Sequence, residues 1–205
     1  AGACAGFVTA FLQTRLGVPS ILAGIVTNIG LYSINLRVMG TSNLSLFQME
    51  TIYTMAKASG FAGSWYKLAV AAVVVIVVAV LLVQFFKTRL GLSIRATGDS
   101  PAMVKSSSIN PAFTITVGLC LSNALTALSG CLLAQSQKSV NIDIGTGMVT
   151  VALASLLIGG VFLGRKKLPL RIFGMVLGAF VFRLVYTVAL RFDMPAFMLK
   201  LVSAV

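Results

Sequence analysis

The sequence predicts an all-α polytopic membrane protein, and three observations lead to that fold class. Hydrophobic residues fill 58% of the 205 positions and charged residues only 10%, whereas charged residues alone make up about 25% of a soluble domain. The mean hydropathy is +1.01. Lys and Arg, which give a net charge of +12, stand in short clusters between apolar runs. That pattern is typical of membrane-protein loops and not of a nucleic-acid-binding face.

The clearest predicted span is the run WYKLAVAAVVVIVVAVLLVQFF at residues 65–86. As a helix, this run would cover about 33 Å, close to the ~30 Å thickness of the hydrocarbon core. Valine favours strands, but a membrane-spanning strand needs only about ten residues and alternates in polarity. The length of the run therefore predicts a helix.

Four further spans are predicted from apolar runs that also contain glycine, amide and hydroxyl residues, as helices packed against other helices do. They cover residues 17–36, 111–135, 147–163 and 172–190. Residues 1–12 and 194–205 resemble parts of two more spans, so we expect a chain that is truncated at both ends. No linker or internal repeat divides it, which predicts one membrane domain over residues 1–205.

The distribution of Lys and Arg predicts the orientation of the spans. Residues 87–105 and 165–171 each contain four cations and are placed in the cytoplasm, whereas residues 136–146 contain one and are placed outside. Alternation then puts Arg15 inside and residues 37–64 outside, with a short helix expected near residues 47–58.

The connecting segment TRLGLSIRATGDSPAMVKSSSINP, residues 88–111, is polar and basic in an otherwise apolar chain. Ser100 followed by Pro101 is a helix-start signal, and Asn110 before Pro111 ends a helix. We expect a short cytoplasmic helix from Pro101 to about Ser107, with glycines 91 and 98 as pivots. Physical reasoning alone leaves two interpretations open: a solvated spacer or a docking surface.

Catalytic motifs are missing from the sequence. It has no histidine, and the HExxH, GxSxG and GxxxxGK[ST] patterns are absent. The three cysteines, Cys4, Cys120 and Cys131, match no metal-ligand spacing. We therefore expect no metal, no cofactor and no enzymatic activity of the chain itself.

The segment from residue 88 onward, followed by GTGMVTVALASLLIGG, resembles the membrane permeases of ABC importers of the branched-chain amino acid and ribose type. The matching positions are Gly91, Arg95, Ala96, Gly98, Ala102, Ile109, Ser129, Gly130, Gly159 and Gly160. GLYSINLRVMGTSNLSL at residues 30–46 is similar to a subgroup associated with tryptophan or tyrosine uptake. Asp99 and Ser108 depart from the family pattern, where Asn and Gly are common.

The resemblance implies a multi-pass protein of the bacterial inner membrane whose segment 88–110 contains a coupling helix. In that family the coupling helix docks on the ATP-binding subunit. The positions implied for this contact are Arg95, Gly98, Asp99, Pro101, Ala102 and Lys105. The implied partners are ATP-binding ABC subunits, an extracytoplasmic substrate-binding protein, a second permease copy and membrane lipid, with no nucleic acid. Amino acids are the expected substrates.

A polar face on the span 111–135 is a candidate for the translocation path. Five branched apolar residues from Val117 to Leu132 fall within an arc of about 80°, and hydroxyl, amide and small residues occupy the opposite side. Such a face turns inward in a membrane, either to line the path or to pack. The path candidates are Asn28, Asn35, Ser122, Asn123, Thr126 and Arg183. Arg183 lies inside a span, where a cation is costly unless it is functional, paired or extended to the interface.

Two other functions remain open at this point. An ion-coupled secondary transporter or channel usually places ionisable groups at mid-membrane. The four acids, Glu50, Asp99, Asp143 and Asp193, all lie in predicted loops or at span ends, which argues against proton coupling. A passive membrane scaffold would tolerate replacement of Asn123 without loss of transport.

Overall fold

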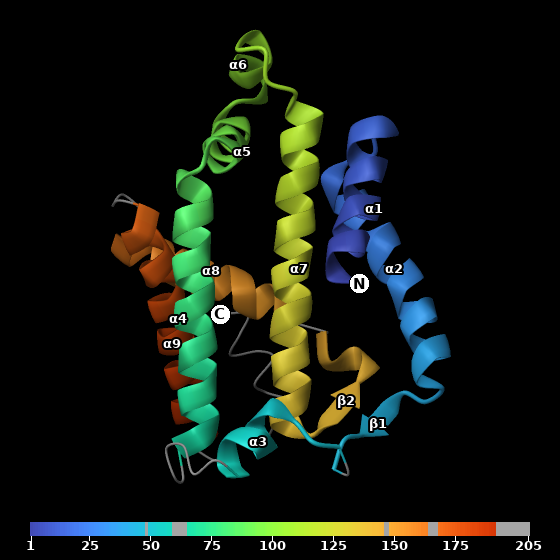
Figure 1. Ribbon diagram of the computed structural model, residues 1–205, viewed down its shortest axis with the longest axis vertical. Coiled ribbons are helices and arrows are strands. Elements are labelled where there is room, and N and C mark those ends of the chain that lie inside the picture. The colour runs from blue at the N-terminus through green and yellow to red at the C-terminus, as the bar shows by residue number, and fades with distance from the viewer. Residues whose placement is uncertain (48, 59–64, 146–147, 164–167, 192–205) are drawn as a thin grey trace. The chain divides into compact units, whose positions relative to one another are not determined.

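The computed structural model describes the chain except for residues 48, 59–64, 146–147, 164–167 and 192–205 (Figure 1). Contacts divide it into two compact units, Ala1–Ile142 and Asp143–Val205, which are treated separately below. The predicted partial span at 194–205 and the cations at 165–167 lie outside the described residues.

The described residues of the first unit form four longer helices, three short helices and two short strands. In chain order these are α1 (Gly2–Arg15), α2 (Ser20–Met39), β1 (Asn43–Ser45), α3 (Ile52–Ala58), α4 (Tyr66–Lys87), α5 (Arg89–Asp99), α6 (Pro101–Ser106), α7 (Pro111–Gln137) and β2 (Ser139–Asn141). Within the described part of the chain, α2, α4 and α7 are long and apolar enough to cross a membrane. The prediction of a helical, multi-pass membrane protein is confirmed.

Helix α1 packs closely along α7, and two of its glycines make this possible. A Cβ atom on Gly2 would stand 2.6 Å from the Cβ of Ala127, and one on Gly6 would stand 2.8 Å from the Cα of Cys120. Helix α2 lies on the other side of α1, where the Thr9 hydroxyl donates to Thr27 Oγ1 at 3.0 Å. The GxxxG spacing of α1 thus marks a helix contact.

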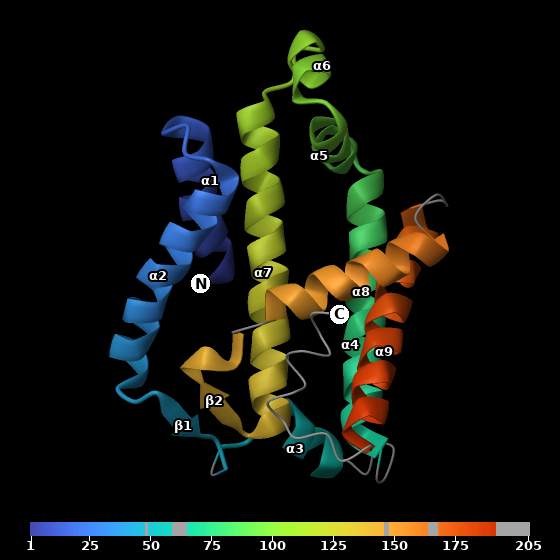
Figure 2. The ribbon, with the colours of Figure 1, turned by 180° about the vertical axis from the view of Figure 1, so that it is seen from behind.

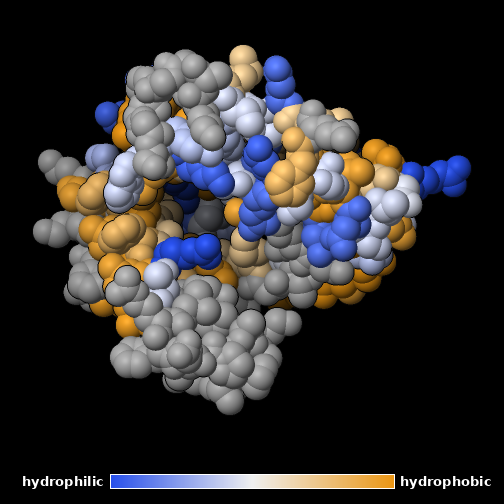
Figure 3. All heavy atoms as spheres, turned by 90° about the horizontal axis from the view of Figure 1, so that it is seen from below, coloured by the Kyte–Doolittle hydropathy of each residue, from blue (hydrophilic) through white to orange (hydrophobic). Residues whose placement is uncertain are grey.

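One end of this unit is formed by α3 and the two strands (Figures 1 and 2). Strand β1 pairs antiparallel with β2, with Asn43 opposite Asn141. The backbone N–H of Ile52 donates to Gln135 Oε1 at 3.2 Å, and Lys67 Nζ donates to the carbonyl of Ser136 at 3.2 Å. The segment before α4 and the segment after α7 therefore lie at the same end of the unit. This agrees with the charge distribution, which places both segments outside. Hydrophilic side chains are prominent where this end is viewed directly (Figure 3).

The sequence predicted a short helix that starts near residue 47, but helix α3 begins at Ile52. Thr51 explains the later start, since its hydroxyl accepts a hydrogen bond from the N–H of Thr54 at 3.3 Å and the Thr54 hydroxyl accepts one from the N–H of Thr51 at 2.7 Å. This reciprocal arrangement is a capping box. It fixes where the helix begins.

The second unit contains α8 (Met148–Leu163) and α9 (Leu168–Arg191), preceded by a 3₁₀ turn at Ile142–Gly145. These helices coincide with the last two predicted spans. A Cβ atom on Gly159 would collide with the carbonyl oxygen of Gly174, and one on Gly178 with that of Ser155. Small residues on both helices therefore permit close backbone contact.

Candidate functional site

Helix α6 has the local structure that the sequence predicts. The Ser100 hydroxyl accepts a hydrogen bond from the N–H of Met103 at 3.4 Å, and Pro101 occupies the first helical position. Val104 is the one buried residue of α6, at 3% exposure. The other five residues of α6 are exposed.

The residues before α6 form a second helix, α5, so the prediction of pivots at Gly91 and Gly98 is wrong. Both glycines lie inside α5, and neither has a positive φ. Thr88 starts the helix, because its hydroxyl accepts from the N–H of Gly91 at 3.2 Å while donating to the carbonyl of Phe85 at 2.6 Å. Gly91 is required for packing, since a Cβ there would stand 2.5 Å from the Cα of Phe86 in α4.

The return from α6 to the membrane depends on Ser108, where the family pattern commonly has glycine. Ser108 adopts φ 61°, in the left-handed region that glycine favours. The N–H of Ile109 donates to the carbonyl of Val104 at 3.2 Å, and that of Ser108 to the carbonyl of Lys105 at 3.3 Å. These two bonds form a Schellman motif, so the helix ends in the usual way with serine in the glycine position.

A buried hydrogen bond joins α5 to α7. Thr97 Oγ1 and Thr114 Oγ1 lie 2.8 Å apart, and the two residues are 5% and 2% exposed. Beside them, Ile94 Cγ2 approaches the backbone of Gly118, and a small cavity of about 230 Å³ lies between the two helices. Sequence analysis missed this contact. A local signal existed in the helical spacing of Leu90, Ile94 and Thr97 after a possible cap at Thr88.

The six residues proposed for contact with an ATPase lie on α5 and α6, and each of them is exposed. Helix α6 lies beyond the ends of α4 and α7, and α5 lies beyond the end of α4 and beside the first turns of α7 (Figures 1 and 2). The exposed residues are Arg95, Gly98, Asp99, Pro101, Ala102 and Lys105. All six residues are therefore accessible to a partner at this end of the unit.

The path candidates on α7 divide between two faces. Asn123 lies against α1, since a Cβ on Gly2 would stand 2.6 Å from the Asn123 carbonyl, and its amide donates to the Leu119 carbonyl in its own helix at 3.0 Å. Ser122 and Thr126 are exposed on the adjacent strip, where the Thr126 hydroxyl donates to the Ser122 carbonyl at 3.0 Å. Ser122 and Thr126 therefore share a strip that α1 leaves open.

The other path candidates lie on α2 and α9. Asn28 and Asn35 are exposed on α2, whereas Ala23 and Thr27 form its contact side toward α1. Arg183 is exposed on α9 in the second unit, where its carbonyl accepts from the Thr187 hydroxyl at 2.8 Å.

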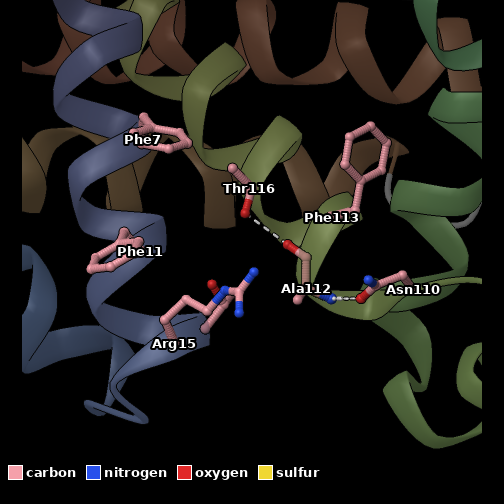
Figure 4. A pocket seen from close by; sticks show the side chains of 8 residues that line it. Phe7, Phe11, Arg15, Asn110, Ala112, Phe113 and Thr116 are labelled. Atoms are coloured by element: carbon pink, nitrogen blue, oxygen red, sulfur yellow. Dashed lines mark hydrogen bonds between the residues drawn. The ribbon is translucent and has the colours of Figure 1, made fainter.

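A surface pocket of about 510 Å³ lies between α1 and the start of α7. Phe7 and Phe11 line one side, and the Arg15 side chain extends toward the first turn of α7, where Asn110 accepts a hydrogen bond from the N–H of Ala112 (Figure 4). Arg15 thus lies at the same end of the unit as the segment 88–110, as the charge distribution predicts. Over the described residues, no cluster of His, Cys, Asp or Glu could hold a metal ion.

Comparison with known proteins identifies the family. The model of the branched-chain amino acid transport system / permease component family matches residues 1–205. The chain is 32% identical over its whole length to a tyrosine transport system permease protein of Clostridioides difficile. It is 29% identical over 78% of its length to an uncharacterised protein of Rickettsia prowazekii. It is also 29% identical over 90% of its length to the galactose/methyl galactoside import permease protein MglC of Salmonella typhimurium.

The chain spans 66% of the first of these relatives and 55% of each of the other two. No solved structure matches it. A family match over all 205 residues agrees with the apolar helices found in both units, and it places the protein in the inner membrane as a multi-pass protein. The chain therefore belongs to the permease component family of branched-chain amino acid transport systems.

Proposed function

We propose that the chain is the membrane-spanning permease subunit of an ATP-driven ABC importer. In this function it performs no bond chemistry. It provides part of a substrate path through the membrane and receives the movement of ATP-hydrolysing subunits in the cytoplasm. All 205 residues form a single permease domain in this proposal, with residues 88–110 as the coupling segment.

The observation that best supports the proposal is the exposed, capped helix α6 beyond the ends of α4 and α7 (Figure 1). A spacer would need only a few residues to connect two antiparallel helices. Here the connection instead contains two helices, fixed by a cap at Thr88, a cap at Ser100 and a Schellman motif at Ser108. Such an ordered structure is suited to binding a partner, and its exposed cations, Arg95 and Lys105, suit an acidic cleft.

The test replaces exposed residues of α6 in the full-length protein produced with its neighbouring ATPase. Ala102→Glu introduces bulk and charge, and Lys105→Glu reverses a charge. We expect both variants to lose ATPase co-purification and substrate uptake while remaining folded. Arg37→Glu, at the opposite end of the unit, is the control and should keep both. ATPase association that survives in Ala102→Glu and Lys105→Glu would refute the docking role.

We further propose that Ser122 and Thr126 line the substrate path and that Asn123 packs against α1. The exposed strip beside the α1 contact supports this division. Asn28, Asn35 and Arg183 remain candidates for the path on other helices. Replacement of Ser122 by Leu should lower uptake without lowering ATPase association, because the change is far from α6.

The proposed substrates are amino acids, and the relative named for tyrosine transport supports an aromatic amino acid. The proposed partners are two ATP-binding subunits, an extracytoplasmic substrate-binding protein, a second permease copy and surrounding lipid. Uptake of labelled tyrosine by cells with and without the gene would test the substrate, with galactose as the competing substrate class suggested by the sugar permease relative.

The alternative is an ion-coupled secondary transporter or channel. The placement of Glu50 and Asp99 in connecting segments disfavours it, because both lie outside the long apolar helices. Gradient-driven uptake by proteoliposomes that contain this protein alone, without ATP, would favour the alternative.

A further inference from the structure

The two hydroxyl groups of Thr97 and Thr114 form a buried polar link between the coupling segment and α7. Their Oγ1 atoms are 2.8 Å apart, with Thr97 on the last turns of α5 and Thr114 on the first turn of α7. Buried hydrogen bonds in a low-dielectric region are strong and directional. The link lies between the exposed surface proposed for the ATPase and the helix proposed for the path.

Each of the two hydroxyl groups also has a hydrogen-bond partner in its own helix. Thr97 Oγ1 is also 2.7 Å from the carbonyl of Ser93, and Thr114 Oγ1 is 2.9 Å from the carbonyl of Pro111. Each hydroxyl has one proton, so one threonine donates across the interface while the other donates to its own helix. When either hydroxyl is removed, the remaining one can still donate to its own helix. Loss of the link therefore leaves no buried donor unpaired.

Helix α5 contacts both α4 and α7, and its backbone comes closest to α4. Gly91 allows its backbone to contact Phe86, and Thr88 bonds both Phe85 and Gly91 at the corner between the helices. Toward α7 the backbones are less close: a Cβ atom on Gly118 would stand 3.5 Å from Ile94 Cγ2, an ordinary packing distance, beside the 230 Å³ cavity. The threonine pair is a direct hydrogen bond across this contact, so a displacement of α5 can reach α7 through it.

We propose that Thr97 and Thr114 are positioning residues that transmit movement of α6 to α7 during transport. This inference rests on the proposed function and adds the contact through which the coupling acts. Thr114 precedes Ser122 and Thr126 by two to three turns of one continuous helix, a distance of about 12 to 18 Å. A tilt imposed at Thr114 would therefore move the proposed path strip directly.

The test measures substrate taken up per ATP hydrolysed by the full-length permease assembled with its ATPase and binding protein. Thr97→Val and Thr114→Val keep the side-chain shape and remove the hydroxyl. We expect ATPase association and hydrolysis to stay near wild type, and the uptake-to-hydrolysis ratio to fall roughly fivefold or more. Thr97→Ser keeps the hydroxyl and should keep the uptake-to-hydrolysis ratio of wild type. The double valine variant should resemble either single valine variant, because all three valine variants lack the same bond.

Two matched controls make the result specific. Thr116→Val removes a hydroxyl two positions from Thr114 that donates only to its own helix, at the Ala112 carbonyl. Ser93→Ala does the same on α5, where the hydroxyl donates to the Arg89 carbonyl. A wild-type ratio in Thr97→Val, or an equal loss in Thr116→Val, would overturn the inference while leaving the permease function intact. Retained ATPase association in both Ala102→Glu and Lys105→Glu would instead refute the docking role in the proposed function.

Discussion

Gly6 in α1 lies directly against Cys120 in α7, so close that a Cβ atom on Gly6 would stand 2.8 Å from the Cα of Cys120. Gly2, one turn earlier, makes the same kind of contact with Ala127. Membrane helices have little hydrophobic driving force between them, and small residues let their backbones approach. The α1–α7 pair therefore depends on these two glycines.

We predict that Gly6→Ala destabilises the protein by about 1 to 3 kcal/mol, because the added methyl group must separate the two backbones. The measurement is the thermal unfolding midpoint in detergent. Gly24→Ala in α2 is the control, since nothing lies within 4 Å of its Cβ position. That substitution should be neutral or stabilise by roughly 0.5 to 1 kcal/mol through helix propensity. Equal midpoints for Gly6→Ala and wild type would contradict the observed contact.

The adjacent glycines 159 and 160 provide a second prediction within α8. A Cβ on Gly159 would collide with the backbone of Gly174 in α9, whereas nothing lies within 4 Å of the Cβ position of Gly160. Gly159→Ala should lower stability by about 1 to 3 kcal/mol, and Gly160→Ala should not lower it. Thermal unfolding of the two variants side by side measures the difference. A larger loss in Gly160→Ala would show that the packed face is assigned wrongly.

The sequence could predict those parts of the fold that local chemistry determines. The long apolar runs predict α2, α4 and α7, and Ser100 with Pro101 predicts where α6 begins, because caps and hydrophobic length act within one segment. Pairing of β1 with β2 could not be predicted in the same way. Its strands are three residues each and almost a hundred positions apart, so no local signal specifies the partner.

In the candidate site, too, local features could be predicted from the sequence and tertiary contacts could not. The exposed positions of α6 follow from its cap and from the polar sequence around it. Gly91 was predicted to be a pivot, because the sequence does not distinguish a glycine at a bend from a glycine at a close helix contact. The separation of Asn123 from Ser122 and Thr126 likewise depends on where α1 packs, and that is a property of the tertiary structure.

Ser108 gives a prediction about the coupling segment. Its φ of 61° is strained for serine, and left-handed conformations cost residues with a Cβ roughly 1 to 2 kcal/mol relative to glycine. Ser108→Gly should therefore raise the unfolding midpoint and preserve uptake. Ser107→Gly is the matched control, because Ser107 has φ −87° and gains nothing from glycine. If both variants change stability alike, the strain at Ser108 is not the cause.

The strip formed by Ser122 and Thr126 predicts a pattern of solvent access. Single cysteines at these positions, in a protein whose native Cys4, Cys120 and Cys131 are replaced by alanine, should react with a water-soluble thiol reagent during ATP-driven transport. A cysteine at Leu128, on the apolar face, should react far more slowly, since thiolates form poorly in hydrocarbon. Substrate should slow the reaction at Ser122 and Thr126 by occupying the path. Fast labelling at Leu128, or labelling at Ser122 that substrate does not affect, would mean that this strip faces another aqueous surface and that the path follows different helices.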